Sequence, residues 1–244
     1  MTRRLTKDEL RRCDAVLDAV AGARSLPEFT RGTLLALEEH FGHAVGEFML
    51  ALNEGAMPGH RAYAGTDNGH APATMEEYFE RWADRDALTS EPARSMYFRT
   101  GRVAVAELYP QLREPHRSYV DRFLRLTKEE AQVSFRLVGR WSDGYLTIGR
   151  LDDEAVLRHL VPQLTALLQE RLPRGIDADV TLREGQVSEL VALGFTNREI
   201  AGVLHVEEDT VKKHVSRAME RIGVSRRTQL AVAWATGVVV ALPS

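Results

Sequence analysis

Hydrophobic and polar residues follow two different spacings along the first 175 residues of the chain. In some stretches apolar residues recur every three or four positions, as Val16 and Leu17 do with Val20, which is typical of a helix with one buried face. In others apolar and polar residues alternate, as over 133–137, which indicates a half-buried strand. Pro162 lies inside the last helical stretch and is expected to kink it or restart it. The patterns predict helices over 6–22, 27–41, 74–83, 91–99, 115–126 and 153–171, and strands over 45–52, 59–65, 102–108, 133–137 and 145–150.

The order of these elements predicts two domains joined by a short linker. Strands separated by helices, followed by a hairpin with a turn at 142–144, indicate a small α/β sandwich over 1–172. A proline, a glycine and two aspartates interrupt the periodic pattern, so 173–179 is interpreted as the linker. The remaining segment, 180–244, contains only helical patterns. We therefore expect an α+β chain that ends in an all-α domain of four short helices.

Two helices of the C-terminal domain begin with the same local motif. In Thr181-Leu182-Arg183-Glu184, and again in Thr196-Asn197-Arg198-Glu199, the threonine and glutamate side chains can bind free backbone N–H groups at a helix start. After a turn at 205–207, a third helix over about 208–222 has one apolar face and one basic face. Two short helices joined in this way indicate a helix-turn-helix, whose second helix lies in the major groove of DNA. A fourth helix is expected over 226–236.

The distribution of charge favours contact with nucleic acid through one local segment and not through the surface of the whole protein. The formal net charge of the 244 residues is -3, so the protein as a whole does not attract polyanions. Residues 210–230, in contrast, hold six basic side chains against one acidic side chain, Glu220. These basic residues are Lys212, Lys213, Arg217, Arg221, Arg226 and Arg227.

The motifs of this segment resemble the signature of the LuxR/NarL-type helix-turn-helix regulators over about 55 residues. Glu207 departs from the family pattern, because Ser or Thr usually caps the recognition helix there, and Gly202 is expected to soften the second helix. The resemblance is carried by Thr181-Leu182-Arg183-Glu184, Gly194-Phe195-Thr196-Asn197-Arg198-Glu199-Ile200-Ala201, Thr210-Val211-Lys212-Lys213-His214-Val215 and Ile222-Gly223-Val224-Ser225-Arg226-Arg227-Thr228.

The resemblance implies a role for particular side chains of the domain. By position, the base-reading sites fall on Lys212, Lys213 and Ser216, with Arg217 beside them. The fourth helix is similar to the dimerisation helix of the family, with Leu230 and Trp234 on one face, although burial of both against their own domain is the alternative. Phosphate contacts are implied for Thr196, Asn197, Thr210 and Arg227.

The N-terminal pattern is most similar to GAF/PAS-like sensory domains of bacterial regulators. A phosphoreceiver domain begins with a strand that ends in two acidic residues. This chain begins with a predicted helix and lacks that acidic pair, so control by phosphorylation is not predicted. Tyr78, Trp82 and Asp86 resemble the cluster of lactone-binding domains, but their order and spacing differ, so an acyl-homoserine lactone is not predicted. Five aromatic residues are candidates to line a ligand cavity, with packing in the core as the alternative: Tyr78, Trp82, Tyr97, Phe98 and Trp141.

Composition excludes several classes of protein. Hydrophobic residues make up 44% and charged residues 27%, which is typical of a globular protein and not of a disordered one. A single cysteine, Cys13, excludes an intrachain disulfide. The eight histidines have no metal-ligand spacing, and neither a phosphate-binding loop nor a nucleophile motif is found, so we expect no catalytic residues, no metal and no cofactor. No signal peptide or membrane span is predicted, which favours a cytoplasmic protein.

The sequence therefore predicts a cytoplasmic bacterial transcription regulator. We expect a homodimer that binds an inverted-repeat DNA operator, with a small-molecule effector or a protein partner at the N-terminal domain and RNA polymerase as a further contact. In one alternative the N-terminal domain only dimerises or docks a protein and binds no ligand. In another, the chain is a ligand-binding module whose DNA-binding domain no longer functions.

Overall fold

The computed structural model describes residues 3–42, 46–53, 58–68, 70–129, 131–149, 154–176 and 178–239. Its N-terminal part is built on a five-stranded antiparallel sheet in the order β2-β1-β5-β4-β3. The strand β5 lies at the centre, because it pairs with both β1 and β4. The strands are β1 (Gly46–Asn53), β2 (Pro58–Asn68), β3 (Arg102–Ala104), β4 (Val133–Leu137) and β5 (Ser142–Ile148).

Three long helices cover one face of this sheet: α1 (Lys7–Ala21), α2 (Leu26–Phe41) and α8 (Ala155–Gln169). They form a single hydrophobic core with strand residues such as Phe48, Phe135 and Leu146. The guanidinium of Arg171, just after α8, donates to the carbonyls of Val20, Ala21 and Ala23 and so fastens the end of α1.

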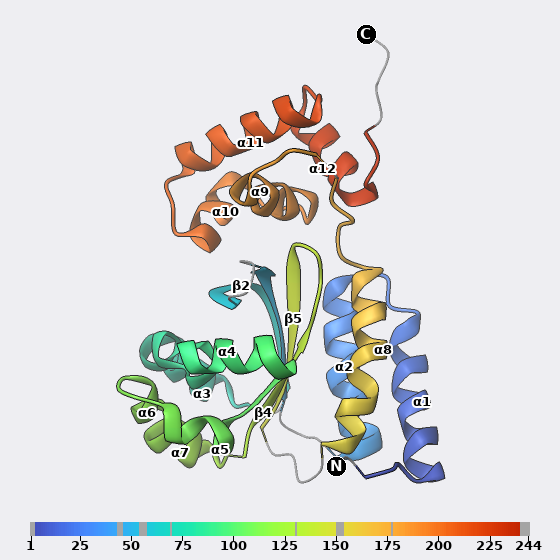
Figure 1. Cartoon of the computed structure of the whole chain (residues 1–244), viewed down its shortest axis with the longest axis vertical. Coiled ribbons are helices and arrows are strands. Elements are labelled where there is room, and N and C mark those ends of the chain that lie inside the picture. Colours follow the sequence, from blue (N-terminus) through green and yellow to red (C-terminus); the bar gives the residue numbers. More distant parts are fainter. Residues whose placement is uncertain are drawn as a thin grey trace.

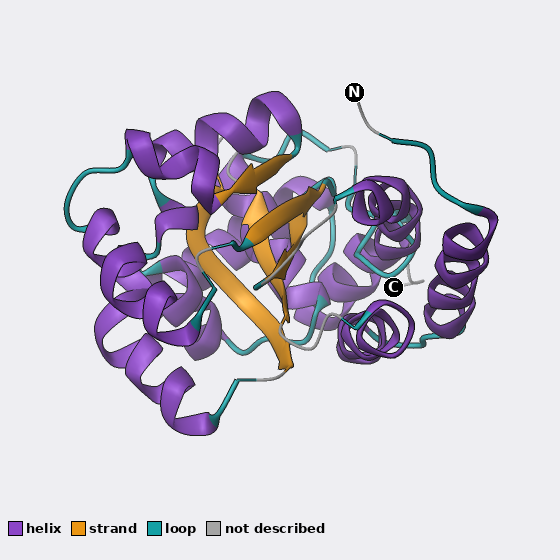
Figure 2. Cartoon of the chain, turned by 90° about the horizontal axis from the view of Figure 1, so that it is seen from below, coloured by secondary structure: helices purple, strands orange, loops and turns teal. Residues whose placement is uncertain are grey.

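Shorter helices cover the opposite face, so the strands lie between two groups of helices (Figure 2). Their side chains form a second core, into which Tyr145 of β5 packs from the sheet. The elements of this layer are α3 (Pro72–Glu77), η1 (Tyr78–Trp82), η2 (Ala83–Arg85), η3 (Ala87–Thr89), α4 (Glu91–Thr100), α5 (Val105–Leu108), η4 (Tyr109–Gln111), α6 (His116–Ser118), η5 (Tyr119–Leu124) and α7 (Arg125–Thr127).

Several predicted boundaries are wrong. The segment predicted as a strand over 102–108 leaves the sheet after Ala104 and continues as α5, whose residues Val105 and Leu108 are buried. Residues 142–144 are part of β5, and the chain reverses direction at 138–141 instead. Pro162 lies inside an unbroken α8. The predicted helix over 115–126, in contrast, is present as an uninterrupted helical stretch over 116–127 made of α6, η5 and α7, and its middle segment, η5, is a π-helix.

The C-terminal part contains four helices: α9 (Leu182–Ala192), α10 (Asn197–Leu204), α11 (Glu208–Ile222) and α12 (Arg227–Thr236). They enclose a third hydrophobic core around Val187, Leu190, Val211 and Trp234. Figure 1 shows that α11 lies on the side of this bundle that is far from the sheet. Leu172 packs in the core beneath α8, whereas Ile176 packs in the C-terminal core, so the chain passes from one core to the other between them.

The segment between the two parts is attached to α12. The backbone N–H of Gly175 donates to the carbonyl of Trp234 at 2.9 Å, and the N–H of Arg174 donates to that of Ala235 at 3.3 Å. Gly175 has a φ of +67°, which a residue with a side chain rarely adopts. The predicted linker therefore follows the end of α12 closely.

Candidate nucleic-acid interface

The two threonine–glutamate motifs begin helices as predicted. The hydroxyl oxygen of Thr196 accepts a hydrogen bond from the backbone N–H of Glu199, and the Glu199 carboxylate accepts one from the N–H of Thr196. Thr181 and Glu184 form the same arrangement at the start of α9. The hydrogen bonds from Thr196 lower the pKa of Glu199 below its usual value. Both helix starts are thus defined by local contacts, and α10 and α11 have the arrangement of a helix-turn-helix.

The predicted base-reading residues share one exposed face of α11. Val211, Val215, Ala218 and Ile222 fill the buried face of the helix. Figure 1 shows that α11 itself lies on the side of the C-terminal bundle that is away from the sheet. All three predicted base-reading residues, Lys212, Lys213 and Ser216, are exposed, as is the adjacent Arg217.

Lys212 is held by two acidic residues of its own helix. Its ammonium lies 2.9 Å from Oδ1 of Asp209 and 3.7 Å from Oε1 of Glu208. The hydrogen bond from Lys212 lowers the pKa of Asp209, and the same bond raises the pKa of Lys212. The amino group is therefore already paired before any DNA approaches, which the sequence analysis did not consider.

Arg227 holds the start of α10. Its guanidinium donates to Oδ1 of Asn197 at 2.7 Å and to the carbonyl of Phe195, and burial lowers its pKa. Asn197 and Arg227, both predicted to contact phosphate, are thus brought together, with Thr196 beside them at the helix start. Thr210 lies in the first turn of α11, half-buried.

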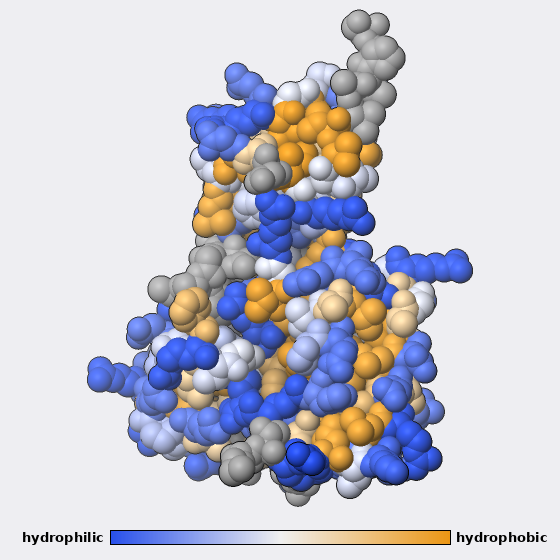
Figure 3. All heavy atoms as spheres, turned by 45° about the vertical axis from the view of Figure 1, so that its right-hand side comes forward, coloured by the Kyte–Doolittle hydropathy of each residue, from blue (hydrophilic) through white to orange (hydrophobic). Residues whose placement is uncertain are grey.

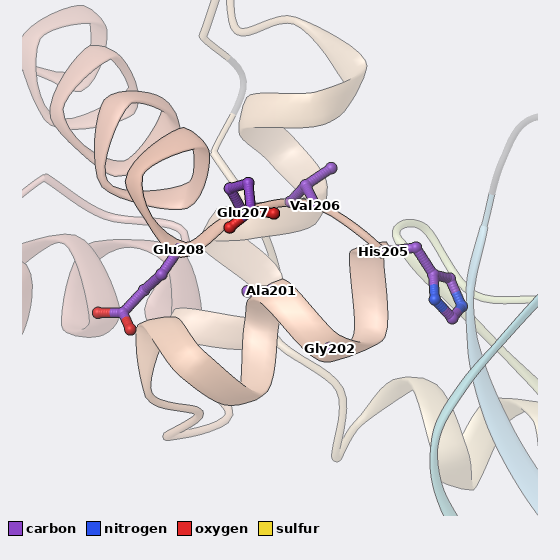
Figure 4. A pocket seen from close by; sticks show the side chains of 6 residues that line it. All are labelled: Ala201, Gly202, His205, Val206, Glu207 and Glu208. Carbon is purple, nitrogen blue, oxygen red and sulfur yellow. The ribbon is translucent and has the colours of Figure 1, made fainter.

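An open hollow of about 460 Å³ lies at the turn between α10 and α11 (Figure 4). Glu207 begins α11 without a hydrogen bond from its side chain to the helix. His205 occupies a left-handed conformation, with a φ of +50°, and in Figure 4 its ring points away from Glu207 and Glu208. Two carboxylates beside the hollow disfavour a phosphate group there. The lining consists of Ala201, Gly202, His205, Val206, Glu207 and Glu208.

The two residues suggested for dimerisation are buried in this chain. Leu230 and Trp234 both have 0% exposure, and the indole N–H of Trp234 donates to Oε2 of Glu189 at 3.0 Å. The burial alternative therefore describes both side chains. Apolar side chains that remain exposed on and after α12 are Val232, Val238 and Val239, and hydrophobic residues gather on this part of the surface in Figure 3.

Glu189 is a buried acid that the sequence analysis missed. It lies on α9 and accepts hydrogen bonds from Trp234 and, at 3.0 Å, from the hydroxyl of Ser142 on β5. Burial raises its pKa to about 7, although the two hydrogen bonds act in the opposite direction. Its helical position alone does not distinguish it from an exposed acid, because its partners Trp234 and Ser142 are distant in the sequence and Ser142 belongs to the other domain.

The structure brings together three of the five aromatic candidates in the N-terminal part. Tyr78, Trp82 and Tyr97 belong to the same core, together with Tyr119 and Phe123, which the sequence analysis did not select. Phe98 is 64% exposed and points away from this core. Trp141 packs against Trp234 of the C-terminal domain, with ring centroids 5.2 Å apart.

A carboxylate lies among these aromatic rings. The hydroxyl of Tyr78 donates to Oδ2 of Asp86 at 2.8 Å, while Oδ1 of Asp86 accepts from the backbone N–H of Leu88. The ring of Tyr78 also packs against Tyr119 and Phe123. Burial raises the pKa of Tyr78 well above its usual value, so its hydroxyl keeps its proton and acts as the donor. The cluster thus combines apolar surface with one oriented polar pair.

Other kinds of site find no support in the described part of the chain. No group of three or more His, Cys, Asp or Glu among the described residues is arranged to hold a metal ion. Within the same residues, no helix is long and apolar enough to cross a membrane.

Comparison with known proteins identifies the C-terminal domain. The family described as "Bacterial regulatory proteins, luxR family" matches residues 179–234. The spore germination protein GerE of Bacillus subtilis is 43% identical over 53 residues, which cover 22% of this chain and 72% of GerE. The chain belongs to the luxR family of bacterial regulatory proteins. It is therefore a transcriptional regulator with a DNA-binding helix-turn-helix domain, and the expectation that it is not an enzyme is confirmed.

Other similar proteins share only part of their length with this chain. The transcriptional regulatory protein LnrK of Bacillus subtilis is 36% identical over 86 residues, which cover 30% of this chain and 39% of LnrK. DegU of Brevibacillus brevis is 42% identical over 53 residues, which cover 22% of each chain. The match thus spans less than half of either protein.

Two solved structures of SdiA are similar over the whole chain. SdiA in complex with octanoyl-rac-glycerol has a TM-score of 0.47 and 16% identity, with 97% of each chain covered. Escherichia coli SdiA has a TM-score of 0.47 and 17% identity, with 95% of this chain and 99% of that one covered. At this level of similarity, the function of the N-terminal domain has to be argued from its own residues.

Proposed function

We propose that the chain reads DNA with the exposed face of α11 and positions itself on the backbone with the start of α10. The observation that carries the proposal is the set of exposed donors, Lys212, Lys213, Ser216 and Arg217, on a helix whose opposite face is packed. A helix fits the major groove, and Lys and Arg donate to the O6 and N7 acceptors of guanine. Thr196, Asn197, Thr210 and Arg227 are the proposed phosphate contacts.

Replacement of Lys212 by alanine tests this assignment. We expect Lys212→Ala to weaken binding to the preferred site by about tenfold to a hundredfold and to relax the preference at one base pair, while binding to random DNA weakens less. Binding of the full-length protein to both DNAs, measured at several salt concentrations, checks this. Lys7→Ala is the matched control, because it removes the same exposed charge from α1. Equal losses on both DNAs would contradict a base-reading role.

We propose further that the protein acts as a homodimer on an inverted-repeat operator. One recognition helix reads only a few base pairs, so two copies related by a two-fold axis are needed for useful specificity in a genome. Because Leu230 and Trp234 are buried, the exposed face of α12 around Val232, which is 53% exposed, is the surface that we assign to the contact. Footprinting should show a roughly palindromic protected region. A monomer that binds a single half-site as tightly as the full site would contradict this.

We propose that the GAF/PAS-like N-terminal sandwich holds a small molecule at the aromatic cluster of Tyr78, Trp82, Asp86 and Tyr97. A mostly apolar lining with a few oriented polar groups is typical of such sites. RNA polymerase is a further proposed contact, and a cytoplasmic location is proposed with it.

The test of the small-molecule site compares operator affinity with and without a cell extract, for the wild type and for Trp82→Ala. If no extract changes the affinity of the wild type, the alternative of a domain that only dimerises or docks a protein is favoured.

A further inference from the structure

The end of the β4–β5 hairpin touches the DNA-binding domain. In Figure 1 this hairpin rises from the sheet toward α9 and α12. Trp141, in the turn, packs against Trp234 of α12 and against the core of the C-terminal domain. Leu52, on the neighbouring strand β1, is buried in the same core. One end of the sheet is therefore the surface on which the second domain rests.

Two glycines form the seat of Trp141. A Cβ atom added at Gly185 of α9 would lie 2.2 Å, 2.4 Å and 2.8 Å from three carbons of the indole ring. A Cβ atom added at Gly175 would lie 2.5 Å from the indole nitrogen. Gly185 lies inside a helix, where alanine is otherwise more favourable than glycine. Its missing side chain is thus explained by the contact with Trp141 and not by the needs of α9.

The turn that carries Trp141 is held rigidly. The backbone N–H of Gly139 donates to Oδ1 of Asp143 at 3.0 Å, and the guanidinium of Arg136 lies 2.7 Å from Oδ2 of the same residue. Next to Trp141, the Ser142 hydroxyl donates to Glu189 of α9. The contact between the domains therefore consists of the packed indole ring of Trp141 and, beside it, the buried hydrogen bond between Ser142 and Glu189.

One polar group of Trp141 has no partner where the ring packs against Gly185 and Gly175. The indole N–H of Trp141 is buried and has no hydrogen-bond partner among the described residues. A buried unpaired donor would regain a hydrogen bond with water if the two domains separated. This favours a contact that can open over one that is permanent.

The same strand reaches the aromatic cluster. Tyr145 in the middle of β5 packs edge-on against Tyr97, with ring centroids 5.3 Å apart, while Ser142 at the start of β5 bonds to Glu189. One continuous strand thus touches both the N-terminal cluster and the DNA-binding domain. A shift of β5 along its own axis would therefore move Tyr145 and Ser142 together.

We propose that the β4–β5 turn is a releasable latch, in which Trp141, seated at Gly185 and Gly175, holds the DNA-binding domain against the sheet. Withdrawal of Trp141 frees that domain to turn about the chain between Leu172, which packs in the N-terminal core, and Arg174, which is bonded to α12. The latch thereby sets the orientation of α11 relative to the N-terminal domain. This inference goes beyond the proposed DNA and effector binding and does not depend on the identity of an effector.

Limited trypsin digestion of the full-length protein tests the latch. The bond after Arg174 leads to Gly175, against which Trp141 packs, so withdrawal of Trp141 uncovers this bond, and its cleavage reports the open state when opening is faster than cleavage. We expect Gly185→Ala, which places a methyl group inside the Trp141 ring, to speed this cleavage by at least about tenfold. Gly202→Ala is the matched control, because a Cβ atom there meets nothing within 4 Å, and it should cleave like the wild type.

A double variant separates release of the latch from damage to α9. Trp141→Ala should also speed the cleavage, and Gly185→Ala should add nothing in its presence, since the methyl group then meets no ring. If Gly185→Ala simply unfolds the second domain, its fragment is digested further, and Trp141→Ala, which leaves α9 intact, decides the question. Cleavage of Trp141→Ala at the wild-type rate, or additive effects in the double variant, would overturn the proposal. DNA retention by each variant is measured separately, so failure of the latch and failure of DNA binding are distinguishable.

Discussion

Lys212 has two sets of partners open to it, the carboxylates of its own helix and the acceptors of a DNA groove. In the free protein it is paired with Asp209 and Glu208 at the start of α11. Acidic residues at a helix start are favourable to the helix, because they interact with its positive end. The same residues lie where DNA phosphates would approach, so they oppose binding. The affinity of α11 for DNA is thus a balance between two neighbouring charges of opposite sign.

Asp209→Asn should shift this balance toward DNA. We expect binding to any DNA to tighten by about twofold to fivefold, and the salt dependence to steepen by about one ion, because a negative charge next to the DNA backbone is removed and the Lys212 ammonium loses Asp209 as a competing partner. Titration of the full-length protein with specific and random DNA at several salt concentrations measures both. Glu220→Gln serves as control, since it removes one exposed negative charge from the same helix. An affinity no higher than that of the control would refute the competition.

At the scale of elements, α9 contacts α11, α12 and the β4–β5 hairpin. It packs against α11 and α12, its Glu184 forms an ion pair with Arg221 of α11 at 3.1 Å, and its Gly185 and Glu189 face the hairpin. The start of α9 is defined locally by Thr181. Weakening that start should therefore lower the stability of the whole second domain.

Thr181→Ala should destabilise the C-terminal domain by about 1 kcal/mol, because the backbone N–H of Glu184 loses its acceptor. Chemical denaturation of the full-length protein, followed by the fluorescence of Trp141 and Trp234, measures this. Thr181→Ser keeps the hydroxyl and should be close to the wild type. If serine and alanine variants are equally unstable, the methyl group of the threonine matters more than its hydrogen bond.

At the scale of the whole molecule, the contact between the domains depends on a buried carboxyl. Burial raises the pKa of Glu189 to about 7, and its partners Trp234 and Ser142 are uncharged donors from the two domains. No charged group is among the causes of the shift. Burial therefore favours the protonated form of Glu189 in the native state, while the hydrogen bonds from Trp234 and Ser142 favour the ionised form.

The stability of the protein should fall as the pH rises from about 4.5 to 7. In this window Glu189 is ionised in the unfolded chain but stays protonated in the native chain. Ionisation therefore stabilises the unfolded state relative to the native state, by on the order of 3 kcal/mol over the whole window. Above pH 7 both states are ionised and this contribution levels off. Glu189→Gln should remove that part of the slope in unfolding free energies measured from pH 4.5 to 8. Glu220→Gln should keep it, and an unchanged slope in Glu189→Gln would show that this carboxyl does not titrate as described.

Local patterns in the sequence were enough to predict most elements of the second domain. Two threonine–glutamate motifs mark the starts of α9 and α10, and glycines follow the ends of α9 and α11, so each boundary depends on residues within one turn of it. The amphipathic spacing of α11 separates its buried face from its exposed basic face in the same way. The family and the exposed donors on α11 could therefore be predicted from the sequence alone.

What depends on distant residues could not be predicted in this way. The alternation over 102–108 resembles a strand, but only 102–104 pair with β4, and Val105 turns into the core instead. Aromatic residues look alike in a sequence, and only packing separates Tyr78, Tyr97 and Trp82 in the cluster from the exposed Phe98. Trp141 and Glu189 belong to different domains, 48 positions apart, and their burial arises only where the hairpin meets α9. Local sequence determined the DNA-reading helix because its causes lie within a few residues, whereas the tertiary structure decided how the two domains are joined, because that contact needs both of them.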